Sequence, residues 1–480
     1  ALAKPVQNGE ISPVTRKELL SATACNRPAM PPQSLENGNS AFSPFSYILY
    51  AAILIMQFGN YEKGIEIGNI ALQLNNIFHA PRFFYKVLSV HGLFLNRWKN
   101  HCKTDLDFLY SSFQYAREAG DFSWASYVAS WIVWTKIVTG EKATVFLKEC
   151  NRLLVFLEKY RTGNEYIVYP TIGRLLNLQG SSDDVFDLSF GNFHESVFRK
   201  ITNKTLLFSF YLQKLQQFYL FEKYNEAMDI SKRMRGIMSG ASGIAILQEY
   251  YFYTALTITA LYRTVGPGRR KQFRAVLKNI QKKFVSWNTV NPINFDHKLS
   301  LINAEIEQIA GNESDAVEFY HKAIQQSYDE KYQFNEALSN ELAGKYFHRK
   351  GYYQISQSFI HRARLLYRAL GITAKVSHLE SSYYPILQHT ENDIESGKPH
   401  ITLPSESTIP LQSVDFISVL KAARALSGEI VLENLLITMM KIAIENAGAQ
   451  KGVLLFNENG HFTIEALGDV DTTGITVFQS

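Results

Sequence analysis

A pattern of turns and helices recurs along the middle of this chain and leaves few folds open to it. Apolar residues follow helical spacing from residue 46 to about residue 387, and Gly, Asn or Asp turns interrupt them every fifteen to twenty-five residues. On three of these turns a Gly is followed by a small residue, a large apolar residue and an Ala at the same spacing. The three copies are Gly59, Gly64, Ile67, Ala71; Gly311, Ala316, Phe319, Ala323; and Gly351, Ser356, Phe359, Ala363.

Each copy predicts a helical hairpin, because the small residue lets two helices approach and the large residues fill the groove between them. The last two copies are shifted by 40 residues at all four positions. A weaker copy without the Gly is Tyr224, Ala227, Ile230, Met234. These units resemble degenerate tetratricopeptide (TPR) repeats, with a period longer than the usual length of about 34 residues. Stacked repeats would form a curved α-solenoid with a concave surface. An irregular α-helical domain is the alternative.

The end of the chain has a different pattern. A helix starting at Asp415 and a second helix over 429–447 precede two short strands, 452–456 and 462–466, which predict a β-hairpin. From residue 412 onward eight acidic and four basic residues give a net charge of −4, which leaves +9 for the rest of a chain whose total is +5. We therefore expect four parts: an irregular segment over 1–42, a helical repeat domain over 43–389, a Pro-containing linker over 390–412, and a separate α/β domain that begins at 413.

Composition excludes several classes of protein. The net charge of +5 with a pI near 8.8 is too small to indicate nucleic-acid binding. Three widely spaced cysteines, Cys25, Cys102 and Cys150, predict neither a disulfide framework nor a zinc site, and they favour a reducing cytoplasm. The longest early apolar run, 45–58, is too short to cross a bilayer. The first residue is not Met and no signal peptide follows it, which favours an internal segment of a longer protein.

Catalytic motifs are absent from the sequence. There is no phosphate-binding GxxxxGK[ST] loop and no protein-kinase motif set, and the turn at 266–268 lacks the context of a glycine fingerprint. His79, His91 and His101 are not spaced as metal ligands on a helix. A Cys and His nucleophile pair at Cys102 or Cys150 stays open, although no third orienting group can be named. We expect no catalytic residue, metal or cofactor in this chain.

A basic stripe on one predicted helix is the best polar candidate for a binding surface. Over 272–284 the apolar residues follow one face, and Arg270, Arg274, Lys278 and Lys282 follow the other at intervals of four. Such a stripe can bind phosphate, an acidic partner domain or an anionic membrane surface. It can also be only the solvated face of the helix.

Two blocks of sequence resemble a known class of protein. Residues 294–305, 311–324 and 335–343 are similar to the helical region of very large bacterial signalling proteins, and 419–433 with 443–455 look like the junction into their GAF domain. Those proteins carry a serine/threonine kinase, a STAND-type ATPase module, the helical region, a GAF domain and often a histidine kinase. The resemblance implies that residues 413–480 are the truncated start of a GAF domain, whose ligand is unknown.

The resemblance implies a role in signal transduction. The chain would be a non-catalytic relay and protein-interaction module, which couples upstream kinase and ATPase modules to a GAF and histidine kinase output. Its partners would be the adjacent domains, bound on the concave surface, and a second copy bound through the helices over 415–447, where Leu420, Ala423 and Leu426 share one face. A small-molecule sensor with its effector inside the helical array is the alternative. The resemblance implies that the parent protein is a serine/threonine protein kinase, a histidine protein kinase or both, although no catalytic motif lies in this chain.

Overall fold

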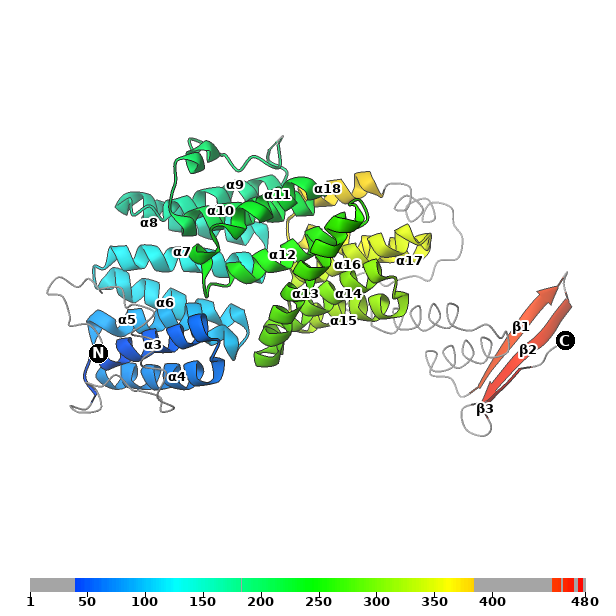
Figure 1. Cartoon of the computed structure of the whole chain (residues 1–480), viewed down its shortest axis with the longest axis horizontal. Coiled ribbons are helices and arrows are strands. Elements are labelled where there is room, and N and C mark those ends of the chain that lie inside the picture. Colours follow the sequence, from blue (N-terminus) through cyan, green and yellow to red (C-terminus); the bar gives the residue numbers. More distant parts are fainter. Residues whose placement is uncertain (1–38, 183, 384–450, 459–460, 470–473, 478–480) are drawn as a thin grey trace.

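The computed structural model describes residues 39–182, 184–383, 451–458, 461–469 and 474–477 (Figure 1). Residues 39–383 form an array of antiparallel helices, and the strands form a small sheet. The first seven α-helices and the short helices among them are α3 (Ser43–Phe58), α4 (Tyr61–Phe78), α5 (Pro81–Val90), η1 (His91–Leu95), η2 (Asn96–Trp98), η3 (Cys102–Thr104), α6 (Asp105–Glu118), α7 (Phe122–Thr139), α8 (Ala143–Tyr160) and α9 (Glu165–Leu178).

Residues 179–182 and 184–194 form no helix, and a second set of helices begins after them. These are η4 (Glu195–Arg199), α10 (Lys204–Leu220), α11 (Tyr224–Arg235), η5 (Met238–Ala241), α12 (Ile246–Leu261), α13 (Pro267–Val290), α14 (Pro292–Ala310), α15 (Glu313–Asp329), α16 (Gln333–Arg349), α17 (Tyr353–Ala369) and α18 (Thr373–Ser382).

The helices begin and end where local chemistry favours it. Asn60 and Asp121 accept hydrogen bonds from the first free N–H groups of α4 and α7, at 3.2 and 3.1 Å. Pro267 and Pro292 start α13 and α14, at positions where a missing N–H costs nothing. The turn glycines of the repeat pattern, such as Gly311 with φ of 92°, adopt the left-handed conformation that ends a helix.

The predicted hairpins are confirmed. The three Gly-marked turns join α3 to α4, α14 to α15, and α16 to α17, and the weaker copy lies on α11, which pairs with α10. The small residues at the fifth position are all buried; a Cβ added at Gly64 would lie 2.5 Å from Ile55 of the preceding helix. At the last position of the pattern Ala71, Ala323 and Ala363 are fully buried. Short side chains at these positions allow the close approach that the pattern predicted.

The helices of the array fall into two groups by burial. The inner helices α7, α10, α12, α14 and α16 are buried on nearly all sides; in α16 every residue from Asn335 to Phe347 is buried. The outer helices α8, α11, α13, α15 and α17 bury one face each, as in α13, where Phe273, Leu277, Ile280 and Phe284 point inward. Inner helices of this kind need protein on both sides, which requires the array to pack against itself.

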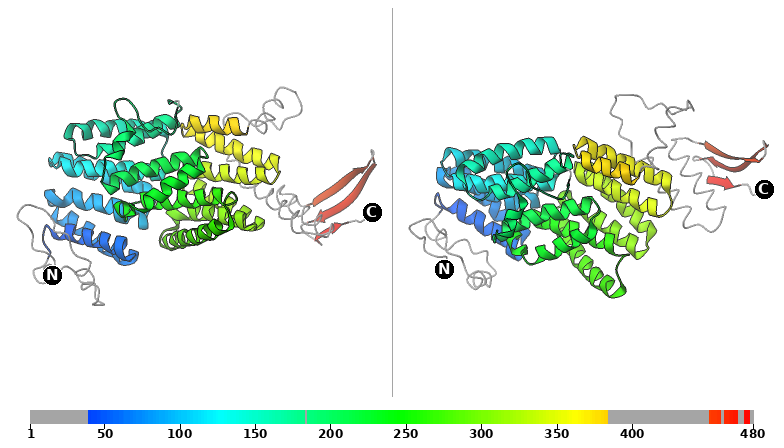
Figure 2. Two further views of the ribbon diagram at one scale, coloured as in Figure 1. Left: turned by 45° about the horizontal axis from the view of Figure 1, so that its top comes forward. Right: turned by 90° about the horizontal axis from the view of Figure 1, so that it is seen from above.

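The array does pack against itself, and this corrects one expectation. Figure 2 shows α3–α9 and α13–α18 as two stacks, with α10–α12 adjoining both. Inner helix α7 of the first stack contacts α12, and Gly140 at its end lies against Phe334 at the start of α16. The side chains of the inner helices are buried by this packing, so they fill the concave surface that we expected to be open to a partner.

The three strands lie near the end of the chain. Strand β1 (Lys451–Glu458) pairs antiparallel with β2 (His461–Asp469), which confirms the predicted hairpin, and β3 (Gly474–Val477) adds a third strand in the order β1-β2-β3. A three-stranded sheet does not by itself define a GAF domain. The two helices expected over 415–447, the linker over 390–412 and the segment over 1–38 lie outside the described residues.

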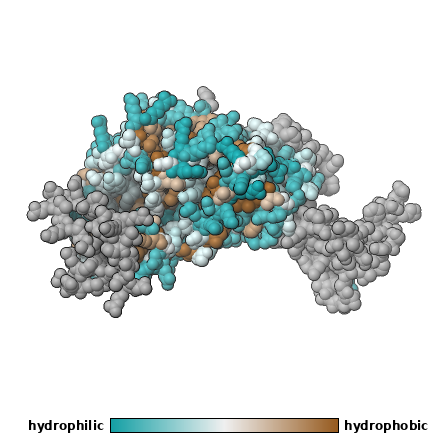
Figure 3. Space-filling model, viewed as in Figure 1, coloured by the Kyte–Doolittle hydropathy of each residue, from teal (hydrophilic) through white to brown (hydrophobic). Residues whose placement is uncertain are grey.

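No helix in the described ranges is long and apolar enough to span a bilayer. The face seen in Figure 3 is mostly hydrophilic, and its hydrophobic areas are small and separate. The proposed division into four domains stays a prediction, although the described helices begin at Ser43 and end at Ser382, close to the expected limits of the repeat domain.

Candidate functional site

The two stacks meet at a junction between residues that are 191 to 230 positions apart in the sequence. Asn291, which directly precedes α14, and Asn294 of α14 each donate from Nδ2 to the carbonyls of Arg97 and Asn100, over 2.6 to 3.0 Å. In return the backbone N–H of Cys102 donates to Asn294 Oδ1 at 2.9 Å. The loop between η2 and α6 is therefore bound to the start of α14 by hydrogen bonds to its own backbone.

A second set of contacts completes the junction at the other ends of the helices. The N–H of Ala143, the first residue of α8, donates to the carbonyl of Leu370 at 2.8 Å. The hydroxyl of Thr373, the first residue of α18, donates to the carbonyl of Gln179 at 2.6 Å. These bonds satisfy backbone groups at helix ends that otherwise have no intrahelical partner.

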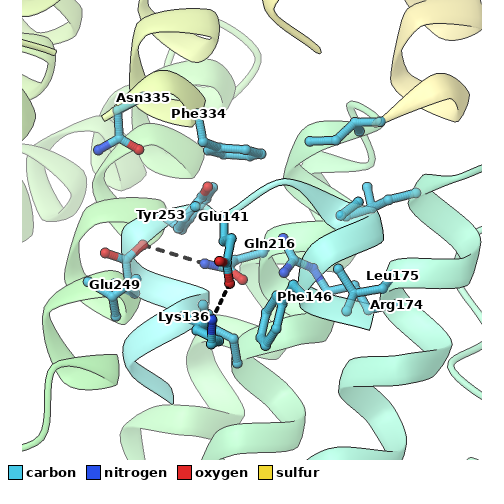
Figure 4. A pocket seen from close by; sticks show the side chains of 16 residues that line it. Lys136, Glu141, Phe146, Arg174, Leu175, Gln216, Glu249, Tyr253, Phe334 and Asn335 are labelled. Carbon is cyan, nitrogen blue, oxygen red and sulfur yellow. Dashed lines mark hydrogen bonds and ion pairs between the residues drawn. The ribbon is translucent and has the colours of Figure 1, made fainter. Parts of the chain in front are cut away.

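A crevice lies inside this junction, between α7, α9, α10, α12 and the start of α16 (Figure 4). Its free volume of about 30 Å³ accommodates about two water molecules. A metabolite of ordinary size has no room there, so the crevice restricts any effector bound inside the array to a small group. Its polar lining residues are Lys136, Glu141, Arg174, Gln216, Glu249, Tyr253 and Asn335.

Both carboxylates of the crevice are already paired with lysines. Lys136 lies 2.5 Å from Glu141, and Glu249 forms a buried ion pair with Lys298 of α14. Gln216 also donates to Glu249, over 3.5 Å. These contacts balance the charge of each carboxylate locally.

Arg174 on α9 is different, because its guanidinium has no hydrogen bond or ion pair with any described residue. The side chain is only 6% exposed, and it extends toward Gln216 and Glu141 (Figure 4). Burial lowers the pKa of Arg174, yet an arginine stays protonated in proteins. Tyr253 and Glu249 oppose this shift from a distance, but neither makes a hydrogen bond or a contact ion pair with Arg174. The crevice therefore contains a charged guanidinium without a hydrogen-bond partner among the described residues.

A second buried ionic cluster, centred on Glu341 of α16, joins α16 to α18. Glu341 Oε1 lies 2.5 Å from the Nζ of Lys345 and 2.7 Å from that of Lys375, and its Oε2 accepts from the hydroxyl of Tyr367 at 2.9 Å. Lys375 also donates to the carbonyl of Leu220 at the end of α10. Burial opposes ionisation of Glu341, but the two ammonium groups outweigh it and lower its pKa to about 2. This cluster holds α18 against the rest of the array.

The basic stripe is on outer helix α13, but its four residues do not form one surface. Arg274, Lys278 and Lys282 are exposed. Arg270 is half-buried, and its guanidinium donates to the carbonyls of Tyr262, Arg263 and Val265, which follow the end of α12. Arg270 thus caps a neighbouring helix, and the exposed stripe consists of the other three.

The remaining candidate residues from the sequence are either buried or lie outside the described part of the chain. Burial raises the pKa of Cys102 to about 11 and that of Cys150 above its usual range, so neither thiol is poised as a nucleophile. Within the described ranges no three His, Cys, Asp or Glu side chains are grouped to hold a metal ion. The residues proposed for self-association, together with the third cysteine, lie outside the described part: Leu420, Ala423, Leu426 and Cys25.

The comparison with known families matches the second half of the helical array. The matching family model is described as CHK1-like, TPR repeats, and it covers residues 184–383 of the 480-residue chain. Residues 184–383 are a TPR-like repeat region. This region contains the Gly311 and Gly351 hairpins, and the Gly59 hairpin has the same spacing outside it. No curated protein matches the chain.

Sequence reasoning missed the crevice and the cluster around Glu341. One signal was available: Arg174 stands within an otherwise apolar stretch of α9, 172–176, where a charged side chain interrupts the buried face. A charged residue at such a position indicates a buried polar contact, because an unpaired charge in a core is costly. The sequence spacing could not show what lies opposite it.

Proposed function

We propose that this chain is a non-catalytic protein-interaction module of a multidomain signalling protein. The TPR-like region over 184–383 supports an interaction role, since repeat arrays of this kind present extended surfaces to protein partners. The resemblance of 294–343 and 419–455 to bacterial signalling proteins supports the larger context. In this proposal the module couples kinase and ATPase domains before it to a GAF domain, and to a histidine kinase output, after it.

The observation that carries the proposal is the charge of helix α13. Seven basic residues and no acidic residue occur within Pro267–Val290, and among the described residues none of the seven forms an ion pair. Other outer helices differ: Lys232 of α11 pairs with Asp229 at 2.7 Å, and Lys322 of α15 pairs with Glu318 at 2.7 Å. An outer helix that contains no acidic residue, and whose basic residues form no ion pair among the described residues, is complementary to an acidic surface.

The proposed partner is therefore an acidic protein surface that docks on α13. The exposed residues Arg274, Lys278 and Lys282 would make the contact, and Arg270 would hold the start of the helix in place. The filled concave surface directs the partner to the outside of the array, and the mostly hydrophilic face in Figure 3 favours contact through charge over contact through a large apolar patch.

The test uses the 480-residue chain and the domains encoded on either side of it in the parent gene. Binding is measured by calorimetry for the unchanged chain and for a variant with Arg274→Glu, Lys278→Glu and Lys282→Glu. The control variant carries Lys142→Glu, Lys148→Glu and Lys159→Glu, three exposed residues on or beside outer helix α8.

Both variants change the net charge by the same amount. A difference in binding between them therefore reports a specific surface and not the total charge. We expect the α13 variant to bind a flanking domain at least tenfold more weakly than the control, and we expect binding of the unchanged chain to weaken as salt rises from about 50 to 300 mM. Equal binding by the two variants, or no binding by any flanking domain, would refute docking on α13. Binding to anionic vesicles in place of a protein would refute the proposed partner.

Self-association through the helices over 415–447 is a separate part of the proposal. Leu420→Asp combined with Leu426→Asp should lower the mass measured by light scattering from that of a dimer to that of a monomer. An unchanged mass would remove the coupling role of these helices.

A further inference from the structure

The crevice at the junction carries a second inference, which does not depend on the partner of α13. Arg174 is 6% exposed and has no hydrogen-bond or ion-pair partner among the described residues. A buried charge without a counter-ion destabilises a fold, and a structure that keeps one gains from anything that compensates it. The other side chains around the crevice indicate what that compensation is.

No carboxylate of the lining is free to compensate Arg174. Glu141 pairs with Lys136 at 2.5 Å, and Glu249 pairs with Lys298, whose side chain is 3% exposed. Each carboxylate of the lining thus already has an ammonium partner, and Arg174 is the charged side chain of the lining that has no ion-pair contact.

Two further donors line the crevice without a protein partner. The Nδ2 of Asn335, a residue that is 7% exposed, makes no hydrogen bond to the described residues. The hydroxyl of Tyr253 also has no bond to them, and burial raises the pKa of Tyr253 far above its ordinary value, so it keeps its proton. In Figure 4 the amide nitrogen of Asn335 is drawn on the side away from Arg174, so Tyr253 is the second donor that can serve the crevice. The two donors, Arg174 and Tyr253, suit a ligand that only accepts hydrogen bonds.

The walls and the size of the crevice further restrict which ligands it can bind. Phe146, Leu175 and Phe334 form apolar walls, and the free volume of about 30 Å³ is that of about two water molecules. A planar guanidinium pairs best with a carboxylate, which accepts two parallel hydrogen bonds. We propose that the crevice is a binding site for a small carboxylate, of the size of formate or acetate, with Arg174 as its principal ligand-binding residue.

The test is direct binding of formate to the 480-residue chain, measured by saturation-transfer NMR on the formate proton. Sodium gluconate, which is too large for the crevice, keeps the ionic strength constant. We expect a saturable signal for the unchanged chain and for the control Arg152→Gln, which removes an exposed arginine of α8. Arg174→Gln should weaken binding at least tenfold. No saturable signal for the unchanged chain, or equal signals for the two variants, would overturn the site.

A second variant keeps the proposal testable where Arg174→Gln fails to fold. Glu141→Gln removes a negative charge from the same crevice and releases Lys136, so formate binding should tighten several-fold. The alternative is that the carboxylate of Glu141 pairs with Arg174 in solution. In that case Glu141→Gln lowers the stability of the chain, and its affinity for formate stays unchanged or falls. That outcome would overturn the proposal. Saturable binding of chloride with equal affinity would also overturn it, since the site would then recognise charge without carboxylate geometry.

Discussion

Replacement of Glu341 by Gln tests how the array holds its last helix. Glu341 is 2% exposed and pairs through one oxygen with both Lys345 and Lys375, whose side chains are 8% and 0% exposed. Gln has nearly the same size and keeps the hydrogen bond from Tyr367, but it carries no charge. The substitution removes the carboxylate that contacts the buried ammonium of Lys375, whereas Lys345 keeps Glu222 at 2.8 Å. Lys375 is the residue that joins α18 to α10 and α16.

The size of the effect follows from the pKa of Glu341. Burial opposes its ionisation, yet the two lysines lower its pKa from 4.5 to about 2, which corresponds to about 3 kcal/mol of favourable interaction in the charged form. This agrees with the ~3–5 kcal/mol that breaking a buried ion pair usually costs. Because the folded-state pKa is depressed, this stabilisation is fully present above about pH 4.5 and is lost as the pH falls toward about 2.

Hydrogen exchange measures the effect locally, which matters because repeat arrays also unfold in parts. At pH 7 the amides of α18 should lose about 100-fold in protection in Glu341→Gln, as expected for about 3 kcal/mol. The control is Glu380→Gln on α18 itself, where a half-exposed carboxylate pairs with Arg364 and Arg368 at 3.3 and 3.1 Å. The loss of local stability in α18 caused by Glu380→Gln should be below about 1 kcal/mol. Equal protection in the two variants would refute the reasoning.

Three further outcomes follow from the packing. Gly173→Ala should destabilise the array by about 1–3 kcal/mol in urea unfolding, because its Cβ would lie 2.0 Å from the carbonyl oxygen of Leu188, whereas Gly266→Ala, with nothing nearby, should change little. Asn294→Ala should cost about 2 kcal/mol or more and expose the Cys102 amide to hydrogen exchange, because it removes four hydrogen bonds at the junction; unchanged exchange would contradict this. Cys102 should resist thiol reagents at pH 8 until urea unfolds the chain, since burial raises its pKa to about 11. Mass spectrometry of the peptide that contains Cys102 measures this, and labelling without urea would contradict the prediction.

The sequence by itself determined the helical hairpins. Gly311 and Ala316 mark a turn and a close helix contact within six residues, and such short-range spacing sets helix faces and turn geometry directly. The same holds for the buried face of α13 and for the hairpin of β1 and β2, both of which the structure confirms. Local patterns were sufficient because the partner of each element is its neighbour in the chain.

Only the tertiary structure decided how the array closes and where its buried charges find partners. Lys375 is 34 residues from Glu341, Lys298 is 49 from Glu249, and the junction joins residues up to 230 positions apart. No periodicity encodes such distances, because they depend on how much each hairpin rotates relative to the previous one. That rotation fills the concave surface, turns Arg270 inward to cap α12, and leaves the guanidinium of Arg174 without a hydrogen-bond partner among the described residues.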